Sequence, residues 1–299
     1  MKYKAALLLF LAMASPAFSA SFEEAEAAFN AGAYADARSI AEELAQSGDI
    51  HAMTLLGRIY RDGRGVDRNL DMAIDWYAKA AGLNDQQAQL DLAMIYLDPD
   101  SGRGDFDRGM GWLRRAAEAG YAEAQFNMGL LSSGAFGNPP EMEAAADWFR
   151  KAAEQGHAGA EYRLGVLYLE GRGVAKDFIA AAEWIGKAAQ QGDVDAMLDY
   201  GVLVIRGDGV QQDIKIGAQW LLVAARRGNV IAQNRVARLY ASGTGVAVDP
   251  VEAMKWNILA TRGGRPDAEL DTMLSKLSDQ QKKEATSRAD AFRPVAGNG

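Results

Sequence analysis

The stretch YLEGRGVAKDFIAAAEWIGKAA, residues 168–189, places Gly171 and Gly173 between two segments whose apolar residues have helical spacing. Two glycines around an arginine could cradle a phosphate, or they could form a corner between helices. A dinucleotide-binding fingerprint also needs a preceding strand and a third glycine, and this stretch has neither. Glycine ends a helix at positive φ without a steric cost. The stretch therefore predicts a corner between two helices.

The rest of the chain repeats this stretch at a fixed interval. All six tryptophans are 36 residues apart: Trp76, Trp112, Trp148, Trp184, Trp220 and Trp256. Alanines keep the same step from Ala52 to Ala268 and from Ala80 to Ala260. The glycine pair recurs as Gly63/Gly65, Gly171/Gly173, Gly207/Gly209 and Gly243/Gly245. Such periodicity is typical of a protein built from stacked repeats.

Each repeat reads as a helical hairpin. Ala73, Trp76, Tyr77, Ala80 and Ala81 follow the i, i+3, i+4, i+7, i+8 spacing of one helical face, and the segment before them does the same. A small residue recurs at one position of the first helix, as Gly57, Ala93, Gly129, Gly165, Gly201 and Ala237. We expect it to let the paired helices approach closely, and we expect each tryptophan to fill the space between successive hairpins.

The pattern A-x-x-x-L-G-x-x-Y, then G-x-G-V, then W-x-x-K-A-A-x-x-G resembles the Sel-1-like repeat family, whose members are relatives of the tetratricopeptide repeats. Residues 160–192 match it most closely. The resemblance implies an all-α, right-handed α-solenoid of helical hairpins with a 36-residue period. It also implies protein binding, often as an exported or periplasmic adaptor in bacteria.

The first residues have the layout of a secretory signal peptide. Lys2 and Lys4 precede an apolar run that is too short to span a bilayer, and small residues follow it. We expect cleavage before Ala20 and a periplasmic or secreted protein. The predicted organisation is a signal peptide at 1–19, a capping hairpin at 20–47, six repeats at 48–263, and capping helices and a tail at 264–299. The repeats are predicted at 48–83, 84–119, 120–155, 156–191, 192–227 and 228–263.

Charge and composition restrict the partners. The net charge is −8, which opposes binding to nucleic acid or anionic lipid, and no segment after the first apolar run suits membrane insertion. The chain has no cysteine, so it can form neither disulfides nor thiolate metal sites. We expect a monomer that binds a protein or peptide partner.

The sequence contains little evidence for a catalytic site. His51 and His157 are the only histidines, are far apart in sequence, and are interpreted as solvated residues at helix starts. The chain lacks the S-x-x-K and K-T-G motifs of β-lactam enzymes. We predict no catalytic residue, no cofactor and no metal site. One alternative stays open, because Asp98, Asp100, Asp105 and Asp107 could supply oxygen ligands to calcium, although solvated turn residues are the favoured interpretation.

The resemblance to tetratricopeptide repeats also implies a concave groove lined by the first helix of each hairpin. In the middle repeats this groove would be apolar, and its two ends would be basic through Arg58 and Arg61 at one end and Arg238 at the other. The predicted partner-binding residues are Leu90, Met94, Phe126, Leu130, Tyr162, Val166, Leu198 and Val202, with Asp91, Asn127, Arg163, Asp199 and Arg235 beside them. These apolar side chains could equally pack against one another or lie beneath the C-terminal segment.

Three function classes follow. The favoured one is an exported adaptor or regulator that binds a protein through the groove. The alternatives are a structural component of a secretion, flagellar or polysaccharide assembly and, less favoured, a cell-wall or β-lactam hydrolase. The stacking order further predicts that Trp256→Ala, near the end, costs less stability than Trp148→Ala or Trp184→Ala.

Overall fold

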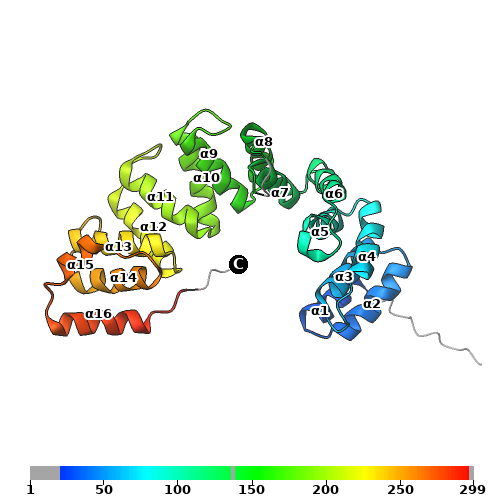
Figure 1. Ribbon diagram of the computed structural model, residues 1–299, viewed down its shortest axis with the longest axis horizontal. Helices are drawn as coiled ribbons and strands as arrows, with labels where there is room; N and C mark the ends of the chain where they lie inside the picture. Colours follow the sequence, from blue (N-terminus) through cyan, green and yellow to red (C-terminus); the bar gives the residue numbers. More distant parts are fainter. Residues whose placement is uncertain (1–20, 136–138, 296–299) are drawn as a thin grey trace, which may run out of the picture. The chain divides into compact units, whose positions relative to one another are not determined.

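The structure, a computed structural model, describes residues 21–135 and 139–295. Within these residues it is all-helical, with sixteen α-helices, one short 3₁₀ helix and no strand, which confirms the predicted fold class (Figure 1). The predicted signal peptide lies outside the described residues. The helices are α1 (Phe22–Asn30), α2 (Tyr34–Gln46), α3 (Ile50–Asp62), α4 (Leu70–Gly82), α5 (Gln86–Leu97), η1 (Pro99–Ser101), α6 (Phe106–Glu118), α7 (Ala122–Ser132), α8 (Met142–Ala153), α9 (Ala158–Glu170), α10 (Phe178–Gln191), α11 (Val194–Arg206), α12 (Ile214–Arg226), α13 (Val230–Ser242), α14 (Pro250–Arg262), α15 (Ala268–Leu274) and α16 (Asp279–Ala291).

Consecutive helices pack as hairpins. Successive hairpins stack because the second helix of one contacts the first helix of the next. The chain divides into an N-terminal unit, residues 1–112, and a C-terminal unit, residues 113–299. In the N-terminal unit α1 packs on α2 and α3 on α4; in the C-terminal unit the pairs are α7 with α8, α9 with α10, α11 with α12 and α13 with α14. None of the helices in the described ranges is long and apolar enough to cross a lipid bilayer.

The glycine pair forms the predicted corner, and its two members have different tasks. Gly171 caps α9 in the left-handed conformation at φ 72°, and its N–H donates to the Leu167 carbonyl at 2.8 Å. Gly173 also has a positive φ, and a Cβ there would overlap the backbone carbonyl of Met142 in the preceding hairpin. The first glycine therefore ends the helix, and the second allows contact between hairpins.

The recurring small residue lets the two helices of a hairpin approach, as predicted. A Cβ built on Gly165 would lie only 2.5 Å from Cγ1 of Ile185 on α10. Ile185 is fully buried and directly follows Trp184 in the sequence. Tyr77, Phe149 and Leu221 contact their own glycines at the equivalent position.

The tryptophans do not occupy this tight space inside the hairpin, although Trp76, Trp112, Trp184 and Trp220 pack partly against the core. In four repeats the residue after the tryptophan fills that space, whereas Trp148 and Trp184 are only half-buried. The ammonium groups of Lys151 and Lys187 lie 4.0 and 3.9 Å from the centroids of these two rings. A lysine amine can screen an aromatic face in this way and stay solvated.

Trp256 is the exception, and its burial reverses the predicted ranking of the tryptophans. Its side chain is 2% exposed, because α16 packs on α14 and Phe292 contacts the indole ring edge-on at 5.5 Å. The C-terminal segment thus covers the last full hairpin. Proximity to the chain end does not make this position less important for the core.

Buried amides tie successive hairpins together at a place that sequence reasoning missed. Gln89, Gln125 and Gln233 each donate Nε2 to a carbonyl near the end of the preceding helix, at 3.0 to 3.2 Å. The glutamine follows the recurrent alanine directly, and its 36-residue step was the signal that could have revealed it. These bonds satisfy carbonyls that a helix end otherwise leaves unpaired.

Candidate functional site

Side chains from three first helices form what we call the first-helix face of the C-terminal unit. Its apolar members are Phe126 and Leu130 on α7, Tyr162 and Val166 on α9, and Val202 on α11. All five are half-buried, and Phe126, Leu130, Tyr162 and Val202 pack partly against the core. Leu198, predicted to belong with them, is 6% exposed and is part of the core itself. Both alternatives from the sequence thus hold in part. The side chains that pack against the core support the fold, and all five also reach the surface.

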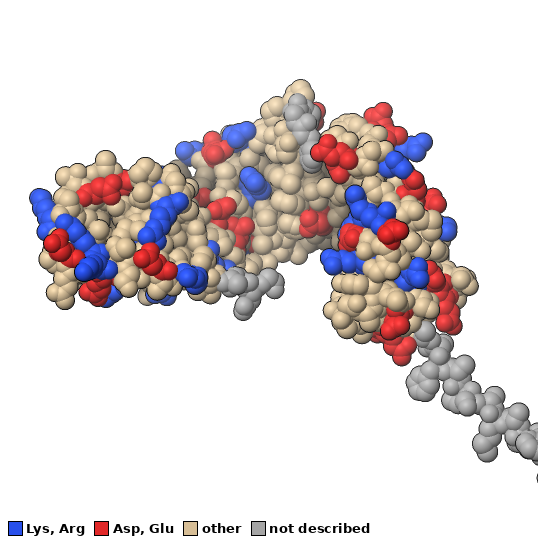
Figure 2. Space-filling view, turned by 60° about the horizontal axis from the view of Figure 1, so that its bottom comes forward, with Lys and Arg blue, Asp and Glu red and all other residues tan. Residues whose placement is uncertain are grey.

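The surface near these helices carries few charges. Figure 2 shows a mostly tan surface over α7 to α10, whereas lysine, arginine and acidic side chains crowd over the C-terminal helices α13 to α16. Arg163 and Arg235 are exposed beside the apolar residues, and Asn127 is half-buried with its amide Nδ2 donating to the Glu123 carbonyl at 2.8 Å. The predicted polar residues therefore lie where a ligand backbone or side chain could reach them.

A hydrogen bond between first helices fixes the register of this face. The Tyr162 hydroxyl on α9 donates to Oδ2 of Asp199 on α11 at 3.0 Å. Burial raises the pKa of Asp199, and the donated hydrogen bond and the charge of Arg235 only partly oppose it. Burial and the same carboxylate also raise the pKa of Tyr162, which keeps the phenol protonated as a donor.

Phe126 is held from two sides at the α7 end. Its ring stacks on His157 with centroids 4.4 Å apart and contacts Phe149 at 5.9 Å. His157 Nδ1 accepts the N–H of Ala160 at 3.1 Å, so its Nε2 carries the proton and faces Glu123 at 2.9 Å. The helix-start interpretation of His157 is right, but its solvation is not, since the ring caps α9 and supports Phe126. His51 has a side chain that is 71% exposed.

The N-terminal unit holds the other three predicted residues. Met94 on α5 is 41% exposed, whereas Leu90 and Asp91 are buried. The Asp91 carboxylate accepts from Arg61 Nη1 at 2.7 Å and from Gln87 Nε2 at 3.1 Å. Burial raises the pKa of Asp91 despite these bonds. Asp91 thus joins α3 to α5, and of these three residues Met94 is the one with exposed apolar surface.

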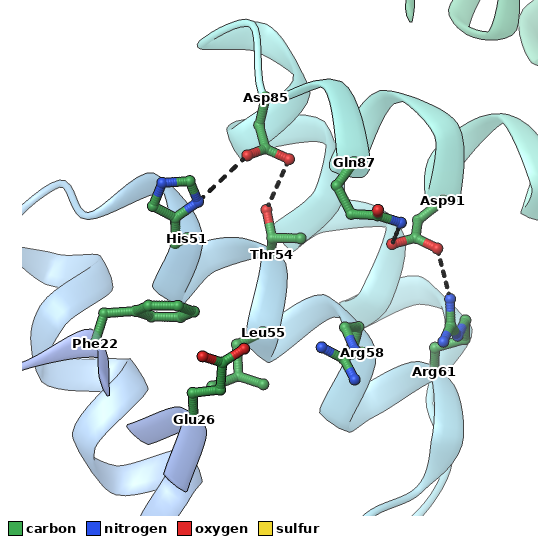
Figure 3. Close-up of a pocket in the computed structure, with 10 residues that line it drawn as sticks. All are labelled: Phe22, Glu26, His51, Thr54, Leu55, Arg58, Arg61, Asp85, Gln87 and Asp91. Carbon is green, nitrogen blue, oxygen red and sulfur yellow. Dashed lines mark hydrogen bonds and ion pairs between the residues drawn. The ribbon is translucent and has the colours of Figure 1, made fainter. Parts of the chain in front are cut away.

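A polar pocket of about 460 Å³ lies beside Asp91, between α1, α3 and α5 (Figure 3). Asp85 caps α5 and also accepts from the Thr54 hydroxyl at 3.2 Å. Arg58 stacks over Phe29 at 4.9 Å, and Glu26 is exposed on α1. Asp91 pairs with Arg61 and Asp85 with His51, and the Thr54 hydroxyl is already committed to Asp85 and to the Ile50 carbonyl. This arrangement lacks a nucleophile activated by a base.

Two arginines of the predicted basic ends, Arg61 and Arg238, are neutralised by acids from the next hairpin. Arg61 pairs with Asp91, and Arg238 makes a two-point contact with Asp267 at 2.8 and 2.9 Å and a third contact with Glu269 at 3.0 Å. These partners are 29 to 31 residues apart in sequence, so only the stacking of hairpins brings them together.

The acidic loop does not assemble a calcium site in the structure. Asp98 Oδ1 accepts the Asp100 N–H at 2.9 Å, and Asp105 caps the start of α6 and pairs with Arg108. Asp107 is exposed in the first turn of α6. Across residues 21–135 and 139–295, no three potential metal ligands come together.

Comparison with known proteins agrees with this architecture. The model of the Sel1 repeat matches six segments, residues 50–85, 86–121, 122–157, 158–193, 194–229 and 230–264. A Sel1 repeat protein from Oxalobacter formigenes is 32% identical over 81% of this chain and all of its own, with a TM-score of 0.71. A protective antigen of uropathogenic Escherichia coli strains, c5321, displays an SLR fold and is 26% identical over 91% of this chain and 68% of its own, with a TM-score of 0.54. The search of curated proteins gave no match. The six matched repeats cover most of the chain, which therefore belongs to the Sel1 repeat family.

Proposed function

We propose that this Sel1 repeat protein is an exported adaptor or regulator that binds a protein partner along the first-helix face of its C-terminal unit. Sel1 repeats generally serve as scaffolds for protein interactions, and the choice of face rests on one observation. Five half-buried apolar side chains follow one another over α7, α9 and α11, with exposed charged residues beside them. A partner that covered their outer sides would gain the free energy of apolar burial, about 25 cal/mol per Å².

The face combines the features of an interaction site. Phe126 and Tyr162 are aromatic anchors whose positions are already fixed, by stacking on His157 and by the bond to Asp199. Ordered anchors lose little conformational entropy when a partner binds. Arg163 is exposed and, within the described residues, has no hydrogen bond or ion pair. It can therefore meet a partner without breaking an internal contact.

The test uses substitutions that change the outer surface and spare the anchors. Val166→Asn with Val202→Asn should weaken capture of the partner, because polar amides replace apolar side chains at the centre of the contact. The matched control is Ile179→Asn with Ile216→Asn, at exposed isoleucines on the second helices α10 and α12. A photocrosslinker at position 163, used in the native envelope and followed by mass spectrometry, would identify the partner.

We expect the crosslinked product to disappear in the Val166/Val202 variant and to persist in the control, with both variants melting as cooperatively as the original chain. Loss of the product in the control alone would move the binding site to the second helices. The stoichiometry of the captured complex also separates a transient regulator from a fixed component of an envelope assembly.

A further inference from the structure

A cavity of about 630 Å³ lies on α13, the first helix of the hairpin that follows those of the first-helix face. It lies between α13 and the segment 264–268 that leads into α15, and Arg235, Arg238 and Arg265 contribute to its lining. Arg235 is at the position in its repeat that Arg163 and Asp199 occupy in theirs, so the cavity continues the polar edge of that face.

One carboxylate in the cavity is already saturated. Asp267 is 9% exposed and accepts from Arg238 through Nε and Nη2, from Asn234 Nδ2 and from the Leu270 N–H. Burial opposes its ionisation, but these hydrogen bonds together hold the pKa of Asp267 below its ordinary value. Asp267 therefore fixes Arg238 and caps α15, and it has no capacity left to neutralise a further cation.

Arg235 and Arg265 are left without such partners. Neither guanidinium group makes a hydrogen bond or an ion pair with any part of the chain that the structure describes, although both residues line the cavity. Burial lowers the pKa of Arg235, and the positive charge of Arg206, followed by that of Arg265, adds to the effect against the single opposing charge of Asp199. Three arginines thus line a cavity whose one lining carboxylate, Asp267, is bound to Arg238, in a chain whose net charge is −8. Because an arginine stays protonated, an incoming anion would relieve their mutual repulsion.

We propose that this cavity binds the acidic side chains of the partner segment whose apolar side chains lie on the first-helix face. The inference rests on the proposed function and adds the chemistry of the partner, an apolar sequence that carries glutamate or aspartate near the end over α13. Guanidinium groups bind carboxylates through two parallel charge-assisted hydrogen bonds. An acidic protein segment fits better than a nucleic acid, since the chain as a whole repels a polyanion and the neighbouring surface is apolar.

The experiment measures peptide binding by fluorescence anisotropy. The probes are two labelled, amidated nonapeptides, one alternating leucine with glutamate and the other alternating leucine with glutamine. The protein variants are Arg235→Gln with Arg265→Gln and, as a control that removes the same charge, Lys282→Gln with Lys283→Gln on α16. We expect the glutamate peptide to bind about tenfold more tightly than its twin, as one charge-assisted hydrogen bond would allow. This preference should vanish in the arginine variant, persist in the lysine variant and shrink as salt is added.

The outcomes separate this inference from the proposal on which it rests. Equal binding of both peptides, unchanged by the arginine substitutions, would overturn the carboxylate site while the glutamine peptide still reports on the apolar face. Binding of the glutamine peptide that ignores Val166→Asn with Val202→Asn would count against the apolar face itself. If neither peptide bound the original chain, both proposals would fail. Circular dichroism melts of each variant exclude a loss of fold as the cause.

Discussion

Gly165 shows how much one absent methyl group controls the packing of a hairpin. A Cβ there would lie 2.5 Å from Ile185 Cγ1 and 3.1 Å from the Ile185 backbone nitrogen. Gly165→Ala should lower the free energy of unfolding, because overpacking costs about 1 to 3 kcal/mol and the better helix propensity of alanine returns only about 1 kcal/mol. Gly111→Ala on α6 is the control, since nothing lies within 4 Å of its added methyl. Urea denaturation should show the control to be equally stable or more stable, and a stabilised Gly165→Ala would refute the close approach.

The raised pKa of Asp199 makes the free energy of unfolding depend on pH. Its pKa is raised above the ordinary 3.8, chiefly by burial, so the folded state holds this proton more tightly than the unfolded chain does. As the pH rises above the ordinary value, the unfolded chain loses the proton first, and the free energy of unfolding falls. Asp199→Asn, which can still accept from Tyr162, removes this dependence. Melting temperatures of the original chain should therefore fall relative to the variant as the pH rises through the mildly acidic range, and a relative rise would contradict the assignment.

At the scale of the elements, α16 decides which tryptophan matters most. The helix packs on α14, and the segment after it brings Phe292 against Trp256, which is 2% exposed. Trp256→Ala should cost about 3 to 5 kcal/mol, as truncation of a buried aromatic does, and more than Trp148→Ala, whose ring is half-buried beneath Lys151. Chemical denaturation of the two variants under one condition would rank them. A larger loss for Trp148→Ala would mean that α16 does not cover this core in solution.

Export is the prediction that belongs to the whole molecule. Residues 1–19 are predicted to be a signal peptide, with cleavage before Ala20. Expression of the full chain in a bacterium should yield a periplasmic or secreted product whose amino-terminal sequence begins at Ala20. A chain that lacks residues 2–19 should stay in the cytoplasm, and cytoplasmic retention of the full-length chain would refute the prediction.

The face proposed for binding could be located from the sequence only in part. The 36-residue step placed Phe126 and Tyr162 on one repeat position and Val166 and Val202 on another, because a regular stack repeats its geometry. It could not tell that Leu198 is buried while Val202 reaches the surface. Exposure at these positions depends on the size of the neighbours in adjacent hairpins, and those neighbours are not periodic.

The sequence by itself determined the helices, their pairing into hairpins and the corner at Gly171, because these depend on contacts within about one repeat. Only the tertiary structure showed that Asp267 saturates Arg238 and that the C-terminal segment buries Trp256. Each of these contacts joins residues about 30 or more positions apart, or involves a segment that breaks the repeat. Their formation depends on side-chain volumes and charges that differ between repeats, so periodicity alone carries no information about them.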